Sequence, residues 1–162
     1  MLFRSDFGKD LAFTISYLQQ QGQNSSSPFY NRTDSMSCVM GHSMGGGASF
    51  LSVQFNPQIN AIANLAPAET NPSAVTAAGS IARPALIFCG DKDCVTPPST
   101  NQIPMYNALS GSCKTLVTIL GGIHCQMANP NTLCNLGEAS CLPSGTISES
   151  QQHAVIDRLL IP

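Results

Sequence analysis

Residues 40–49 read MGHSMGGGAS, and this stretch decides which fold we expect for the chain. Within it, residues 41–45 match the pattern Gly-x-Ser-x-Gly. The apolar residues 37–40 before the pattern are typical of a short strand, and residues 44–55 after it are typical of a helix opened by glycines. A serine at such a strand-to-helix turn is held in a strained backbone conformation that projects its hydroxyl from the sheet edge. We therefore take Ser43 as a candidate nucleophile, with an incidental serine in a glycine-rich turn as the alternative.

The same turn predicts small residues on both sides of the serine. We expect a Cβ at Gly41 or Gly45 to collide with the neighbouring strand and helix. The start of the following helix also places positive potential and N–H groups beside the serine hydroxyl.

A serine hydroxyl is a weak nucleophile without a base, and the chain has 3 histidines. His124 follows the apolar run 116–120 and two glycines that let the loop turn back over the strand ends. His42 lies inside the serine turn and is expected to point away from the hydroxyl, and His153 is expected to be a surface residue of the last helix. We therefore predict that His124 is the base.

A carboxylate must hold the tautomer of that histidine and balance the charge that develops on its ring. The apolar run 85–89 leads into a loop that carries both Asp91 and Asp93. We favour Asp93, because Gly-x-x-Asp-x-x-x-Pro is the usual shape of this loop. Asp91 is then expected to be a turn carboxylate beside Lys92.

The rest of the chain predicts alternating helices and strands. A polar, turn-rich loop is expected at 22–34 and a long, cysteine-bearing loop at 125–148. Such alternation predicts an α/β fold, in which a parallel sheet of about four strands has helices on both faces. The expected strands are 37–40, 59–65, 85–89 and 116–120, and the expected helices are 6–21, 44–55, 104–109 with Pro104 first, 150–160, and one turn near 74–78.

Taken together, these segments resemble the α/β-hydrolase superfamily, and within it the bacterial cutinase and polyester-hydrolase group with its dienelactone-hydrolase relatives. The order serine, aspartate, histidine along the chain is the order of that superfamily rather than of trypsin or subtilisin. The resemblance rests on MGHSMGGGAS at 40–49, RPALIFCGDKDCVTPP at 83–98 and LGGIHCQMAN at 120–129.

This resemblance implies a serine hydrolase that cleaves small-molecule or polymeric carboxylic esters through an acyl-enzyme on Ser43. Asp93 would be the acid and His124 the base, and the backbone N–H of Met44 would be one oxyanion donor. No metal or cofactor is implied. A serine hydrolase of another substrate class (a lipase, thioesterase or peptidase) and a non-catalytic fragment stay open as alternatives.

Two departures from the family pattern carry expectations of their own. Cutinases of this group have a Trp in the substrate cleft, whereas this chain has APAE at 66–69 and contains no Trp. We therefore expect aromatic polyesters to be poor substrates. The family fold also has strands before these four, so we expect residues 1–162 to form a single truncated domain that lacks the second oxyanion donor and leaves the strand at 37–40 as an open edge.

Composition excludes several classes of protein. Only 10% of residues are charged and the net charge is -2, which excludes a basic nucleic-acid binder and a charged disordered tail. No apolar run is long enough to span a membrane, and residues 1–10 show no signal peptide.

The 7 cysteines favour disulfides and an oxidising compartment, and together with the resemblance they predict a secreted or periplasmic protein. Cys38 and Cys89 lie in apolar runs and are expected to be buried, inert thiols. Sequence does not determine the pairing. The pairs we favour are Cys134 with Cys141, and Cys94 with either Cys113 or Cys125.

Overall fold

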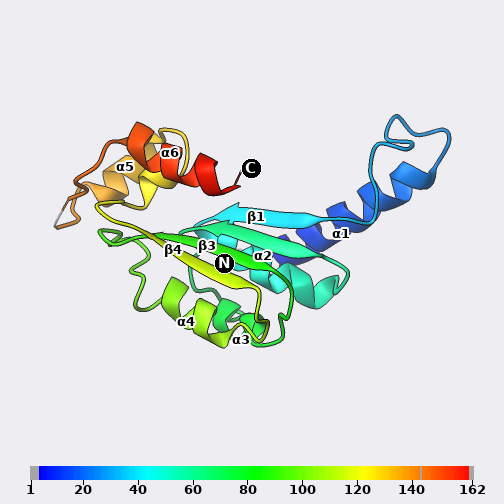
Figure 1. Ribbon diagram of the computed structural model, residues 1–162, viewed down its shortest axis with the longest axis horizontal. Helices are drawn as coiled ribbons and strands as arrows, with labels where there is room; N and C mark the ends of the chain where they lie inside the picture. Colours follow the sequence, from blue (N-terminus) through cyan, green and yellow to red (C-terminus); the bar gives the residue numbers. More distant parts are fainter. Residues whose placement is uncertain (1–3, 143, 161–162) are drawn as a thin grey trace.

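The centre of the molecule is a parallel sheet of four strands in chain order. The computed structural model describes residues 4–142 and 144–160, and Figure 1 shows their arrangement. The register places His42 opposite Leu65 and Gly90 opposite Ile119, so the carboxyl ends of the strands lie along one edge. Open parallel sheets place their functional residues at that edge. The strands are β1 (Cys38–His42), β2 (Ala61–Leu65), β3 (Ala85–Gly90) and β4 (Lys114–Ile119).

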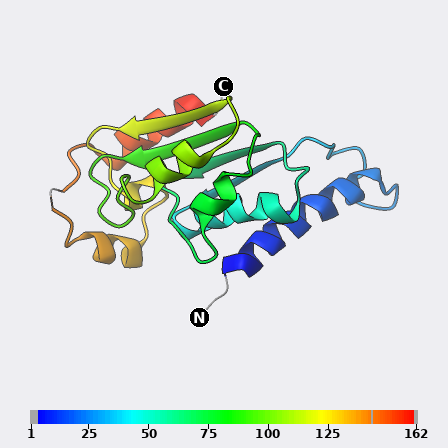
Figure 2. The same ribbon diagram turned by 90° about the horizontal axis from the view of Figure 1, so that it is seen from below.

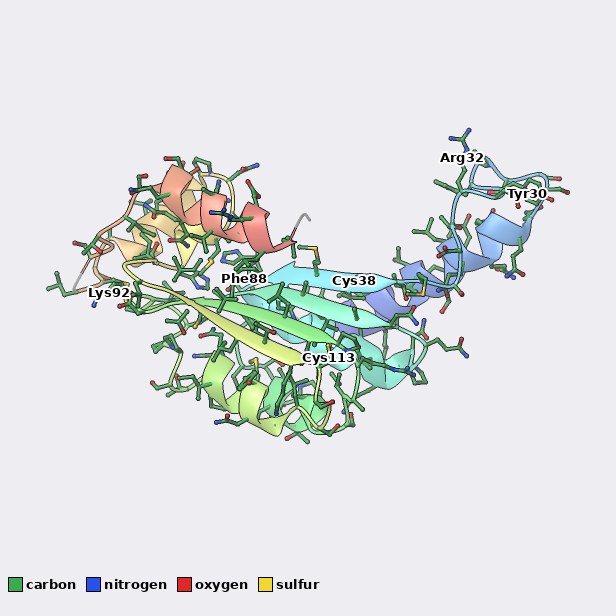
Figure 3. The ribbon with its side chains drawn as sticks, viewed as in Figure 1. Tyr30, Arg32, Cys38, Phe88, Lys92 and Cys113 are labelled. Carbon is green, nitrogen blue, oxygen red and sulfur yellow. A yellow bond between two sulfur atoms is a disulfide. The ribbon has the colours of Figure 1, made fainter. Side chains whose placement is uncertain are left out.

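Helices cover both faces of the sheet, which confirms the predicted fold class (Figures 1 and 2). Ile87 of β3 joins the apolar core under one set of helices, whereas Phe88 joins a second core under α6 (Figure 3). This alternation explains why the run 85–89 is apolar throughout, since a strand covered on both faces has no polar side. One face carries α1 (Arg4–Gln23), α2 (Met44–Phe55), α3 (Ala74–Ala78) and α4 (Gln102–Ala108), and the other carries α6 (Glu149–Leu160).

The predicted helices and strands are present with ends moved by no more than two residues, the usual uncertainty at helix and strand ends. The helix 44–55 and the helical turn 74–78 have the predicted bounds. The prediction that Pro104 opens its helix is wrong, because α4 begins two residues earlier at Gln102. A proline is still tolerated there, since the first four N–H groups of a helix have no partner within it.

The predicted loop 125–148 contains two helical segments, a correction to the sequence reading. The 3₁₀ turn η1 spans Cys125–Met127, and α5 spans Thr132–Glu138. The side chain of Asn131 caps α5 by accepting hydrogen bonds from two backbone N–H groups of its first turn. Its two leucines, Leu133 and Leu136, are 81% and 68% exposed, so they do not join the apolar core.

The disulfide pairing that we favoured is wrong. The structure pairs Cys94 with Cys141 and Cys125 with Cys134. Cys89 is buried as expected, and burial raises the pKa of its thiol.

Cys38 is exposed, contrary to expectation, because it begins a strand at the edge of the sheet. It lies with Cys113 at the end of the sheet away from Lys92 (Figure 3). Among the described residues, none of the helices combines the length and the hydropathy that a membrane-spanning segment requires.

Candidate active site

Ser43 occupies the turn between the end of β1 and the start of α2. Its backbone has φ 56° and ψ -122°, a left-handed conformation that a residue with a side chain rarely adopts. Three backbone bonds hold it there: Ser43 N–H donates to the Leu65 carbonyl at 3.1 Å, and the Ser43 carbonyl accepts from Ala68 and Gly47 at 2.8 and 3.1 Å. The side chain makes no capping bond to α2. The strained backbone is therefore held by bonds to the end of β2, to the loop after it and to α2, and the hydroxyl is not used to start the helix.

The two glycines that flank the serine are not equivalent. A Cβ on Gly41 would overlap the carbonyl of Gly45, so the prediction for Gly41 is confirmed. For Gly45 the prediction is wrong, since a Cβ there meets nothing within 4 Å. Gly45 faces open space at the start of α2, whereas Gly41 is in contact with that helix.

Asp93 and His124 form a buried pair across two loops. His124 Nδ1 lies 2.8 Å from Asp93 Oδ2, and the two residues are 2% and 4% exposed. Because a carboxylate only accepts hydrogen bonds, Nδ1 carries the proton of the neutral ring and Nε2 carries a lone pair. The pairing thus sets the tautomer that a general base requires.

Asp91, the other carboxylate in this loop, lies elsewhere. Its Oδ1 accepts a hydrogen bond from Gly121 N–H at 2.6 Å, and its Oδ2 is 3.4 Å from Lys92 Nζ. This matches the turn role that the sequence assigned to it, and it leaves Asp93 beside His124.

Thr96 is a member of this cluster that the sequence reading missed. Its N–H and its Oγ1 donate to the two oxygens of Asp93 at 2.7 and 2.8 Å, and Oγ1 is also 2.9 Å from His124 Nδ1. Gln102, which is fully buried, donates to Thr96 Oγ1 at 3.2 Å and to the Pro67 carbonyl at 2.7 Å. The Asp-x-x-Thr spacing, which allows a side chain to bond a backbone three residues on, was the available signal.

His42 contacts His124, a contact that the sequence did not predict. Its ring centroid is 4.6 Å from that of His124, and its Nε2 lies 3.1 Å from the His124 carbonyl. A carbonyl only accepts, so Nε2 of His42 carries a proton. Burial, and then the charge of His124, lower the pKa of His42 below its ordinary value.

The loop before His124 is held from α6. Gln152, fully buried, accepts from Ile123 N–H at 3.0 Å and donates to the Ile123 carbonyl at 2.8 Å. The last histidine, His153, is the next residue of α6 and is half-buried, whereas a surface residue was expected. Among the described residues, no group of three or more His, Cys, Asp or Glu side chains is placed to hold a metal ion.

Comparisons with known proteins place the chain among cutinase-like and PET hydrolase-like sequences. A family described as PET hydrolase-like matches residues 5–141. Cutinase 1 of Thermobifida cellulosilytica is 34% identical over 110 residues, which is 67% of this chain and 40% of that protein. A cutinase of Thermobifida fusca (strain YX) is 34% identical over 110 residues, 67% of this chain and 35% of the relative. Cutinase est1 of Thermobifida alba is 37% identical over 90 residues. The chain therefore spans well under half the length of these relatives.

Proposed function

This chain belongs to the PET hydrolase-like family, and from that premise we propose that it is part of a serine hydrolase that cleaves carboxylic esters. Ser43 is the nucleophile, His124 the general base and Asp93 the acid that orients the base. The observation that carries the proposal is the buried Asp93–His124 hydrogen bond of 2.8 Å, at the same sheet edge as a serine with φ 56°.

The reaction has two steps, and His124 transfers a proton in each of them. As Ser43 Oγ attacks the ester carbonyl, Nε2 of His124 accepts its proton, and Asp93 balances the charge on the ring. His124 then gives that proton to the departing alkoxide, which leaves an acyl group on Ser43. Water then attacks the acyl group while His124 accepts a proton from it, and His124 returns that proton to Ser43 Oγ as the bond between Oγ and the acyl group breaks and the carboxylic acid product is released. General base catalysis of this kind contributes about 10²–10⁴-fold.

The oxyanion of each tetrahedral intermediate needs hydrogen-bond donors. Met44 is the first residue of α2, where the helix dipole favours a negative charge, and we assign its backbone N–H to this task. One such donor contributes about 10²–10³-fold.

The oxidising compartment that we infer from the resemblance is supported by the two disulfides.

A substrate panel tests the reaction class. We expect the full-length protein to hydrolyse short p-nitrophenyl esters with a higher kcat/KM than long-chain esters, thioesters or anilides, and to lose this activity in Ser43→Ala. A preference for long-chain esters would indicate a lipase, and a preference for thioesters or amides would indicate another hydrolase class. No turnover of any member would contradict the proposal.

A further inference from the structure

A buried carboxylate holds the backbone on both sides of the His124 side chain. Glu138, the last residue of α5, is 8% exposed. Its Oε1 accepts a hydrogen bond from His124 N–H at 2.6 Å, and its Oε2 accepts one from Cys125 N–H at 2.9 Å. Among the residues that the structure describes, no lysine or arginine pairs with it. A buried charge is costly without such partners, so these two N–H groups are what stabilises the carboxylate.

The two bonds fix the direction in which the His124 side chain leaves the backbone. The N–H groups of residues 124 and 125 flank the Cα of His124, so a carboxylate that binds both fixes the orientation of the Cα–Cβ bond. The His124 carbonyl is held as well, by His42 Nε2 at 3.1 Å and by Met127 N–H at 3.1 Å. The hydrogen bond between His124 Nδ1 and Asp93 then restricts rotation of the imidazole ring about the side-chain bonds.

Glu138 itself is tied to both members of the buried pair. Cys94 and Cys125 directly follow Asp93 and His124 in the sequence, and their disulfide partners, Cys141 and Cys134, lie on either side of Glu138. Cys141 N–H also donates to the Glu138 carbonyl at 2.9 Å. The segment 132–141 therefore links the loop of the acid to the loop of the base.

We propose that Glu138 is a positioning residue for the reaction, which holds Nε2 of His124 in line with Ser43 through the backbone and not through the imidazole. The proposal rests on the proposed function, in which His124 is the base. A shift of about 1 Å in such a group costs about 10²-fold in rate, because the reacting atoms leave their productive geometry. A purely structural residue would alter the amount of folded protein but not the turnover of each folded molecule.

Glu138→Gln is the variant that tests this role. The amide keeps the shape of the side chain, but only its oxygen can accept, so one of the two N–H groups faces an NH₂ group. We expect kcat per active site, titrated with a fluorophosphonate, to fall about 10–100-fold with KM unchanged. Glu138→Asp keeps a carboxylate and should recover part of the loss. Glu149→Gln, on the first turn of α6, is the matched control and should behave as the wild type.

A second readout does not depend on turnover. The proton on His124 Nδ1, between ring and carboxylate, gives a downfield NMR resonance, which we expect to shift or broaden in Glu138→Gln and to stay unchanged in Glu149→Gln. Wild-type kcat per titrated site in Glu138→Gln, or an unchanged resonance in a folded sample, would overturn the proposal. If wild-type protein shows no turnover, the proposed function fails, and the resonance still decides whether Glu138 positions the ring.

Discussion

At the scale of single residues, Thr96 connects three polar groups through one hydroxyl. Its proton goes to Asp93 Oδ2, its lone pairs face Gln102 Nε2 and His124 Nδ1, and its own N–H takes the second oxygen of Asp93. The carboxylate therefore keeps its orientation independently of the histidine. Since hydrogen bonds to charged groups contribute about 1.5–3 kcal/mol, the Thr96 hydroxyl contributes measurably to the stability of the Asp93–His124 pair.

Thr96→Val removes this hydroxyl while it keeps the shape of the side chain. We expect kcat for a short ester to fall about 10–100-fold, which is the loss of one such bond in the transition state. Thr96→Ser restores the hydroxyl and should return most of the activity. Wild-type kcat in Thr96→Val, measured on folded protein, would show that the hydrogen bond from the Thr96 hydroxyl is not required to orient Asp93.

His42 predicts how stability depends on pH. Burial lowers the pKa of its ring, so the folded protein binds a proton there less readily than the unfolded chain does. As pH falls through the ordinary range of histidine, the unfolded state gains the proton first and the free energy of unfolding decreases.

We expect His42→Gln to lose less stability than the wild type between about pH 7.5 and about pH 5.5, as measured by the urea midpoint at each pH. Titrating groups that do not contact His42 are common to both proteins, so their contributions cancel in the comparison; His124 contacts His42 and is the exception. Equal losses of stability in the wild type and in His42→Gln would contradict a lowered pKa of His42 in the folded protein.

At the scale of elements, α5 shows why part of the site could not be predicted. The positions proposed for the triad, Ser43, Asp93 and His124, were predicted from strand ends and loop spacing, which are local patterns. Glu138 acts through contacts between loops, and no spacing marks it among the other polar loop residues. Thr96 follows Asp93 at the Asp-x-x-Thr spacing, but its contact with His124 joins two loops that are distant in sequence. The disulfide pairs were missed for a related reason, since connectivity depends on how 125–141 folds back over the loop of Asp93.

The two disulfides should contribute unequally to stability. The chain-entropy estimate is about 4 kcal/mol for Cys94–Cys141, which are 47 residues apart, and about 2.5 kcal/mol for Cys125–Cys134, which are 9 apart. We expect urea unfolding to show a larger loss in the Cys94→Ser/Cys141→Ser double variant than in the Cys125→Ser/Cys134→Ser variant. A larger loss of stability in the Cys125→Ser/Cys134→Ser variant would mean that local geometry, rather than loop closure, determines how much each disulfide contributes.

At the scale of the whole molecule, the candidate site lies at one end of the sheet, and the edge formed by β1 faces solvent. The strand β1 is one of the two edge strands of the described sheet, with β4 at the other edge, and Met40 on β1 is 46% exposed. A groove of about 480 Å³ runs across the opposite end of the sheet from the site, between the strands and the end of α6; its lining includes Cys38, Ala63, Leu86, Cys113 and Leu160. Unpaired strand edges and apolar surface of this kind favour association.

We therefore expect residues 1–162, expressed alone, to associate as concentration rises, with an increase in mass by light scattering. Met40→Lys adds a charge to the strand, a device that blocks pairing of edges, and should reduce the association. A monodisperse monomer at all concentrations, in both the wild type and the variant, would contradict this.

Site-resolved labelling tests the assigned nucleophile and base together. A fluorophosphonate should add once to the full-length protein, on the tryptic peptide that contains Ser43, and should not add to Ser43→Ala. In His124→Ala the rate of labelling should fall about 10²–10⁴-fold, since the base is gone. An adduct on another residue, or labelling of Ser43 at an unchanged rate without His124, would contradict the assignment.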